Sequence, residues 1–267
     1  MALPSSAEYP SGSFPDLLQR FGSGQDQDVF GIPVNRNSVP IQMGFVRKVY
    51  LITICQIITV AVMTTTLVNI PLLFNWLQES KYAWWIFIFP AFIISILVAW
   101  QLWMQYFRLP LETQATMLAI TSFLMSLIFA DLISKLCYHE GFVVIFMVFF
   151  GVIGLLLFTA QTRFPFKGPL PIVCTVGSIC LSSPWFRHEY QLDPIQILWP
   201  ISLASIFCIY LVFDLYYAMN GLMPNDYILA NLCFYIDVAY PIRCLHHLCE
   251  LSDTFELFPE ILTPRPS

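Results

Sequence analysis

The sequence predicts an all-α polytopic membrane protein, and its composition is the first reason. Hydrophobic residues make up 58% of the 267 residues, charged residues only 11%, and the mean hydropathy is +0.71. A soluble domain usually has about a quarter charged residues and less than half apolar ones. As a soluble monomer, this chain would leave large apolar patches in water. The composition therefore excludes an ordinary soluble enzyme, a nucleic-acid-binding protein and a disordered regulator.

Seven apolar segments are the second reason. A helix that crosses a bilayer needs about 20 apolar residues, so seven crossings need about 140, just over half the chain. Each segment is predicted to be a helix, because an open sheet cannot satisfy its backbone groups in lipid. The predicted spans are Tyr50–Ile70, Tyr82–Met104, Gln114–Ile133, Phe142–Ala160, Pro169–Trp185, Ile195–Met219 and Tyr227–Leu248.

The linkers are too short for an extramembrane domain, so the chain divides into three parts. Residues 1–44 are predicted to be a disordered polar tail, residues 45–250 the seven-helix membrane domain, and residues 251–267 a short C-terminal tail. Arg47 and Lys48 directly precede the first span and favour a cytosolic N-terminus. The side of the C-terminus stays open, because the seventh segment could be re-entrant.

The cysteines and histidines give no metal or redox signal. Most of the eight cysteines lie inside apolar stretches, where cysteine behaves as a small hydrophobic residue, and no C-x-x-C spacing occurs. His246 and His247 would need a further ligand from a nearby helix to bind a metal ion. We therefore expect neither a metal site nor a cofactor.

Two aspartates are the candidate functional residues, because an ionisable group within a span is costly. Asp214 lies in YLVFDLYY of the sixth segment and Asp237 in CFYIDVAY of the seventh. If these segments form a hairpin, the two carboxylates could lie at similar depth. Two such groups in a low-dielectric site share one proton and titrate as a unit. The pair would then act as a pH-sensitive latch or as a cation site; alternatively, each Asp is only hydrogen-bonded to neighbouring helices.

Four ordered motifs resemble those of the Bax inhibitor/lifeguard family (transmembrane Bax-inhibitor-motif proteins). FVRKVYLITICQIITV is similar to the family's F-[IV]-R-K-V-Y entry into the first helix. FTAQTRF resembles F-x-x-Q-T-[KR] after the fourth helix, and the FD of the sixth span resembles Y-D-T-Q followed by glycine. NDYILANLCFYIDV resembles the acidic-Tyr-x-x-A…Y-x-D seventh helix. The resemblance covers residues from about 45 to 250.

The resemblance implies a fold in which six helices surround a central C-terminal helix. It also implies a calcium-permeable leak pathway in an intracellular membrane that restrains cell death, with Asp214 and Asp237 as a hydrogen-bonded pH sensor. Basic residues after the second helix act as the latch partner in the family, and Arg108 is the candidate for that role here. Arg108 stands in FRLPLE where members often read R-x-P-x-N, and Leu215 and Tyr216 replace Thr and Gln after Asp214.

The favoured hypothesis is a pH-gated Ca²⁺ leak, non-enzymatic, most simply in the endoplasmic reticulum, with vacuolar, Golgi and mitochondrial membranes as alternatives. A second hypothesis is a non-conducting interaction protein that binds cell-death regulators of the Bcl-2 type. A third is an intramembrane aspartyl protease, which also places one Asp on each of the sixth and seventh helices. The G-x-G-D motif of such proteases is missing, because Phe234, Tyr235 and Ile236 precede Asp237.

Overall fold

The computed structural model describes residues 33–70, 75–76, 84–136 and 140–239, and within these ranges the regular elements are all helical. Short helical turns precede α1 (η1, Val34–Arg36), precede α3 (a π-helical turn, Trp84–Ile88) and follow α3 (η3, Tyr106–Arg108). The α-helices are α1 (Val39–Asn69), α3 (Phe89–Gln105), α4 (Leu111–Leu136), α5 (Glu140–Phe158), α6 (Leu170–Glu189), α7 (Leu198–Ala218) and α8 (Tyr227–Ala239).

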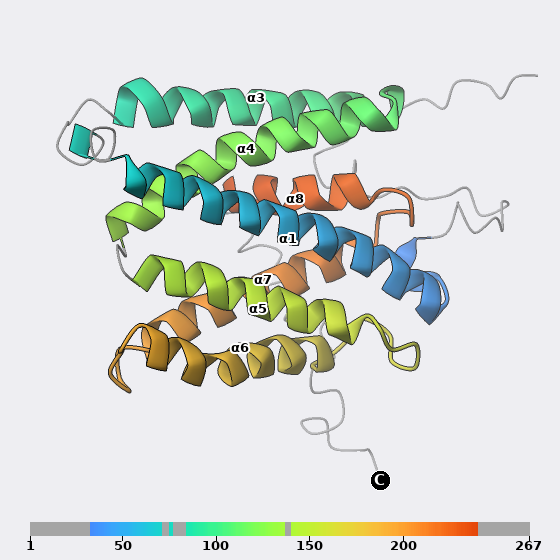
Figure 1. The fold of residues 1–267 in the computed structure, drawn as a ribbon. Helices are drawn as coiled ribbons and strands as arrows, with labels where there is room; N and C mark the ends of the chain where they lie inside the picture. The colour runs from blue at the N-terminus through green and yellow to red at the C-terminus, as the bar shows by residue number, and fades with distance from the viewer. Residues whose placement is uncertain (1–32, 71–74, 77–83, 137–139, 240–267) are drawn as a thin grey trace, which may run out of the picture.

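The helices form a bundle in which α1 and α8 lie between two outer groups (Figure 1). On one side α3 packs against α4, and on the other α5 packs against α6 and α7. Helix α1 contacts both groups, through α4 and α5, while α8 contacts α1, α3, α4 and α7. The start of α1, the α3–α4 turn, the α5–α6 loop and the α7–α8 loop all lie at the same end of the bundle (Figure 1), which we call the loop end.

Helix α8 is buried on every face. From Ile228 to Phe234 each side chain is at most 5% exposed. A helix surrounded by protein can carry polar residues that lipid would penalise. This position agrees with the central C-terminal helix that the resemblance implies.

Helix length, composition and the outward-facing apolar side chains agree with the prediction of a membrane protein with several spans. Five helical segments are long and apolar enough to cross a bilayer: Val39–Asn69, Trp85–Arg108, Leu111–Ile133, Gly141–Phe158 and Leu198–Ala218. Large apolar side chains point outward from the bundle, among them Leu181 at 84% and Leu157 at 69% exposed. Helix α6 is less apolar and contains Pro184, and α8 has only 13 residues. The predicted seventh span continues to Leu248, outside the described residues, so seven crossings stay a prediction.

Helical structure begins earlier than residue 45, the predicted start of the membrane domain. Helix α1 starts at Val39 after Ser38, with a proline in its first turn, where the missing N–H costs nothing. Val34 N–H donates to Leu222 O at 3.0 Å, and Asn35 N–H donates to Met219 O at 3.2 Å. The segment ahead of α1 is therefore fastened to the α7–α8 loop, whereas residues 1–32 of the predicted tail lie outside the described part.

Two glycines let α5 approach its neighbours closely. A Cβ at Gly154 would lie 2.6 Å from Ser178 Cβ and 3.0 Å from Cys174 O of α6. A Cβ at Gly151 would lie 2.6 Å from Cys208 Sγ of α7. Hydroxyls from α6 use this proximity, since Ser178 Oγ donates to Phe150 O at 2.8 Å. Small residues and short polar contacts are the usual basis of helix packing in lipid.

Candidate functional site at the loop end

The first and second family motifs, far apart in sequence, meet at the loop end. Arg47 of α1 donates through Nη2 to Thr159 O at 2.7 Å, just after α5. Gln161 then shapes the loop: its Oε1 accepts from the backbone N–H groups of Arg163 and Phe164, and its Nε2 donates to Phe164 O. Arg47 and Gln161 therefore have a structural role, because together they fix the end of α5 and the turn after it.

The first motif also meets the last one. Lys48 Nζ lies over the ring of Tyr227, 5.2 Å from its centroid, at the start of α8. Asp226 precedes this tyrosine and accepts from Met223 N–H at 3.2 Å, which closes the turn before the helix. Because Asp226 is 7% exposed and closes the turn ahead of α8, it belongs to the scaffold of this junction.

One turn deeper, a buried amide joins α1 to α8. Asn231 is fully buried and accepts from Thr53 Oγ1 at 3.1 Å, while its Nδ2 donates to Tyr227 O at 3.0 Å and Val49 O at 3.4 Å. Residue types and spacing did not single out Asn231 in the sequence. The one available signal is a polar residue within an otherwise apolar segment.

Asp214 lies on α7 at this same end, only 6% exposed. Tyr50 of α1 is fully buried and within electrostatic range of Asp214 and Cys208. Its ring packs on Phe166 of the α5–α6 loop, with centroids 6.1 Å apart, and Phe166 also contacts Phe158. Asp214 is therefore enclosed by protein, close to the aromatic group that Tyr50 forms with Phe158 and Phe166.

The other two predicted site residues are less firmly placed. The backbone of Asp237 belongs to the last turn of α8, but its side chain lies outside the described part, so its pairing with Asp214 stays a prediction. Arg108 ends η3 and is exposed. Among the described side chains no ion pair joins Arg108 to Asp214, so the latch role of Arg108 also stays a prediction.

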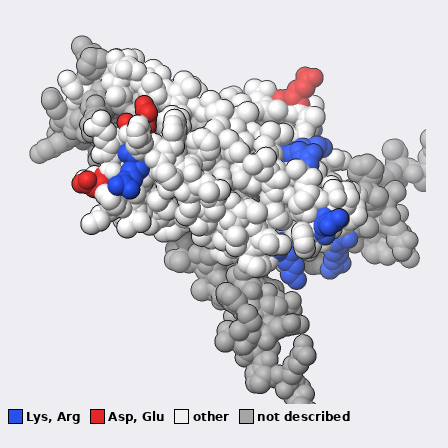
Figure 2. Space-filling view, turned by 60° about the horizontal axis from the view of Figure 1, so that its bottom comes forward, with Lys and Arg blue, Asp and Glu red and all other residues white. Residues whose placement is uncertain are grey.

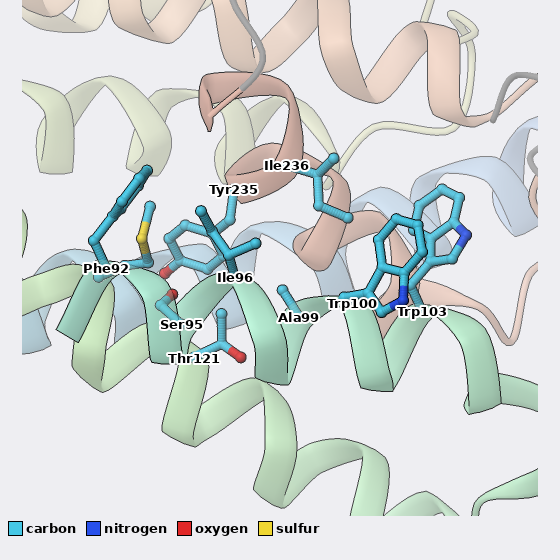
Figure 3. Close-up of a pocket in the computed structure, with 10 residues that line it drawn as sticks. Phe92, Ser95, Ile96, Ala99, Trp100, Trp103, Thr121, Tyr235 and Ile236 are labelled. Atoms are coloured by element: carbon cyan, nitrogen blue, oxygen red, sulfur yellow. The ribbon is translucent and has the colours of Figure 1, made fainter. Parts of the chain in front are cut away.

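A second group of polar side chains lies beside the far half of α8. Gln56 Nε2 of α1 donates to Ser122 Oγ of α4 at 3.1 Å, and Ser122 also hydrogen-bonds with the phenol of Tyr235 on α8. Figure 3 shows the ring of Tyr235 facing Ser95 and Thr121 across a cavity of about 50 Å³ between α3, α4 and α8. These contacts fix α8 against its neighbours just before Asp237.

The charged side chains support the predicted orientation. Figure 2 shows a broad uncharged band between the two ends of this face, with most Lys and Arg side chains gathered towards one end. At the loop end the described chain exposes Arg36, Arg47, Lys48, Arg108, Arg163 and Lys167. Under the positive-inside rule these charges favour the cytosolic side for the loop end, and the orientation stays a prediction.

The described residues contain no group of three or more His, Cys, Asp or Glu side chains that could hold a metal ion. The titratable groups of the loop end are instead dispersed among aromatic, amide and guanidinium partners. What this arrangement offers chemically is one buried carboxyl group, that of Asp214, on α7.

Comparison with known proteins gives one consistent match. The chain is 22% identical over 236 residues to the "Golgi anti-apoptotic protein" of vaccinia virus, in strains Lister, LC16m0 and LC16m8. The match covers 88% of this chain and 97% of the viral protein. This match to an anti-apoptotic protein supports the resemblance to the Bax inhibitor/lifeguard family. No family model and no solved structure matches.

The extent of this match agrees with the structure. The similarity extends along nearly the whole viral protein, so it concerns the helices from α1 to α8 together and is not limited to one shared span. The family motifs also converge in space, with Arg47, Thr159 and Tyr227 within one junction. The resemblance therefore concerns the whole membrane domain.

Proposed function

We propose that this chain is a Bax-inhibitor-like membrane protein that restrains programmed cell death and provides a pH-sensitive leak pathway for Ca²⁺. The match to an anti-apoptotic protein over 97% of that protein's length is the observation that supports the first part most strongly. The second part rests on Asp214, a carboxyl group 6% exposed within α7, and on Asp237 near the end of α8.

The mechanism follows from the cost of charge in the bundle. Two carboxylates close together in a low-dielectric site cannot both ionise cheaply, so the pair gains or loses one proton as a unit. The change of one charge favours one packing of α8 against α1 and α7 over another. The packing of α8 is therefore the two-state element of the mechanism. Carboxylate oxygens are also ligands that Ca²⁺ prefers, so the ionised pair attracts the permeant ion.

Calcium flux into proteoliposomes that contain the purified protein tests this proposal. We expect wild-type flux to change across the pH range in which the pair titrates, and Asp214→Asn or Asp237→Asn to make it independent of pH. Asp193→Asn is the matched control, because Asp193 is exposed between α6 and α7. An unchanged pH profile in both buried variants would exclude the mechanism.

A wild-type protein that passes no calcium at any pH would favour the second hypothesis, a non-conducting protein that binds cell-death regulators of the Bcl-2 type. Protection of cells from an apoptotic stimulus, measured with the same variants, then separates the two parts of the proposal. Protection that persists in a protein without flux would leave the anti-apoptotic role standing and remove the leak.

We also propose an intracellular membrane as the location. The name of the viral relative favours the Golgi apparatus over the endoplasmic reticulum that the sequence first suggested. Co-staining of a tagged chain with markers of both compartments decides between them, and a plasma-membrane signal would contradict both.

A further inference from the structure

A second cavity, larger than the one beside Ser95 and Thr121, borders the α1–α8 contact through Thr53, and neither Asp214 nor Asp237 lines it. Its volume is about 300 Å³, and five helices contribute to its wall: α1, α4, α5, α7 and α8. One wall residue from each helix is Val60, Ile133, Ile145, Leu203 and Phe234, in chain order. An apolar cavity of roughly 150 Å³ in a protein interior already holds a benzene molecule, so this cavity has room for several methylene groups.

The polar groups of the wall already have partners within the protein. Thr53 donates to Asn231, Gln56 donates to Ser122, and the Tyr210 hydroxyl donates to Phe234 O at 3.2 Å. Tyr235 hydrogen-bonds with Ser122. A buried water needs two to four polar partners, and each of these groups already makes a hydrogen bond within the protein. The remaining wall is aliphatic and aromatic, so the cavity favours an apolar occupant over water.

The cavity is continuous with the surface that faces lipid. Phe207 forms part of the wall and is itself 36% exposed, while the adjacent Ile206 points outward at 65% exposed. Both belong to a helix long and apolar enough to span the bilayer. Hydrocarbon chains of the membrane therefore lie beside the opening, at high local concentration.

We propose that this cavity is a binding site for one acyl chain of a membrane lipid, which enters between the helices from the bilayer. The floor of the site is formed by Ile145 and Phe234, each 5% exposed, so an inserted chain reaches residues that ordinary surrounding lipid cannot touch. The occupant contacts α8 directly through Phe234. The site does not depend on whether the chain conducts calcium.

Photochemical labelling from the lipid tests the proposal. The full chain is reconstituted in phosphatidylcholine vesicles in which one acyl chain carries a diazirine, irradiated, and mapped by mass spectrometry. We expect labelled Ile145 and Phe234 in addition to the outward-facing Ile206. Leu155 is fully buried away from the cavity and sets the background. Labelling at Ile145 and Phe234 no higher than at Leu155 would overturn the proposal.

Two variants that fill the cavity distinguish binding of an acyl chain inside it from contact with the surrounding lipid. Leu203→Trp and, should that variant fold poorly, Val60→Phe place extra volume within the wall. Each is expected to lower labelling of Ile145 and Phe234 to the Leu155 level while Ile206 stays labelled. Leu181→Trp, on the lipid-facing side of α6 at 84% exposure, is the matched control and leaves all positions unchanged. Unaltered interior labelling in both filled variants would contradict an acyl-chain site.

Discussion

The α5–α6 contact and the surroundings of α8 show two different ways to hold helices together in a membrane. At α5–α6, glycines allow the backbones to meet so closely that a Cβ at Gly154 would lie 2.6 Å from Ser178. Around α8, the helices are joined by side-chain hydrogen bonds such as Thr53 to Asn231, and they border cavities of about 50 and 300 Å³.

This difference has a mechanical consequence. A close-packed contact has one arrangement, because the volume of even one methylene group disturbs it. A contact made of a few hydrogen bonds beside cavities can exchange partners without a clash. We therefore assign α5 and α6 to the rigid frame of the protein, and α8 with its neighbours to the part that responds to protonation or to an occupant.

The largest effect is expected when the rigid contact is broken. Gly154→Leu places a side chain against Ser178 Cβ and Cys174 O, and overpacking of this kind costs about 3 kcal/mol or more when backbone must move. We expect a large loss of folded protein, measured as thermal unfolding of the detergent-solubilised chain.

Gly177→Leu supplies the control for that experiment. Gly177 lies on α6, one residue before Ser178, and a Cβ there meets nothing within 4 Å. Its variant should unfold within a few degrees of the wild type. Equal losses in both variants would mean that helix flexibility, and not close approach, is what these glycines provide.

A smaller effect is expected at the hydrogen bond between α1 and α8. Single changes Thr53→Val and Asn231→Leu, together with the double change, form a double-mutant cycle for this bond. Side-chain hydrogen bonds between membrane helices contribute about 0.6 kcal/mol on average and up to about 1.7 kcal/mol. We expect a coupling energy in this range, from unfolding in mixed micelles.

Thr65→Val serves as the comparison in that cycle, because Thr65 is exposed and donates only to Ala61 O within α1. Combined with Asn231→Leu it should show no coupling. A coupling energy near zero for Thr53 and Asn231 would show that the two groups find replacement partners. The contrast between the α5–α6 contact and the surroundings of α8 would then depend on the cavities alone.

The smallest effect is expected at Tyr235. Tyr235→Phe keeps the ring between the two cavities and removes the hydrogen bond with Ser122, which is worth about 1 kcal/mol or less. Hydrogen exchange of α8 amides should rise more than the global unfolding midpoint falls. A shift confined to α5 and α6 would contradict the division into a rigid and a responsive part.

Much of the architecture could be predicted because composition and span length depend on local sequence. Six of the predicted spans fall on α1, α3, α4, α5, α6 and α7, although the helix limits differ by several residues. The burial of Asp214 was also predictable from its place within an apolar segment.

The contacts could not be predicted, because they depend on register between helices distant in sequence. Nothing near Arg47 indicates that its partner is Thr159, and nothing near Asn231 indicates Thr53. The larger cavity is likewise a result of how five helices meet. The predicted roles of Asp237 and Arg108 depend on the same kind of register and await the flux measurements.

The fastening of the segment before α1 bears on how the chain is made. The side chain of Asn35 donates to Asn220 Oδ1 at 2.6 Å across 185 residues of sequence. Ribosomes add about 5–20 residues per second, so the two partners are synthesised roughly 10–40 s apart. During that interval every helix from α1 to α7 must be inserted without this fastening. Assembly of the loop end is thus a late event of biosynthesis, and a chain truncated before residue 220 would lack it altogether.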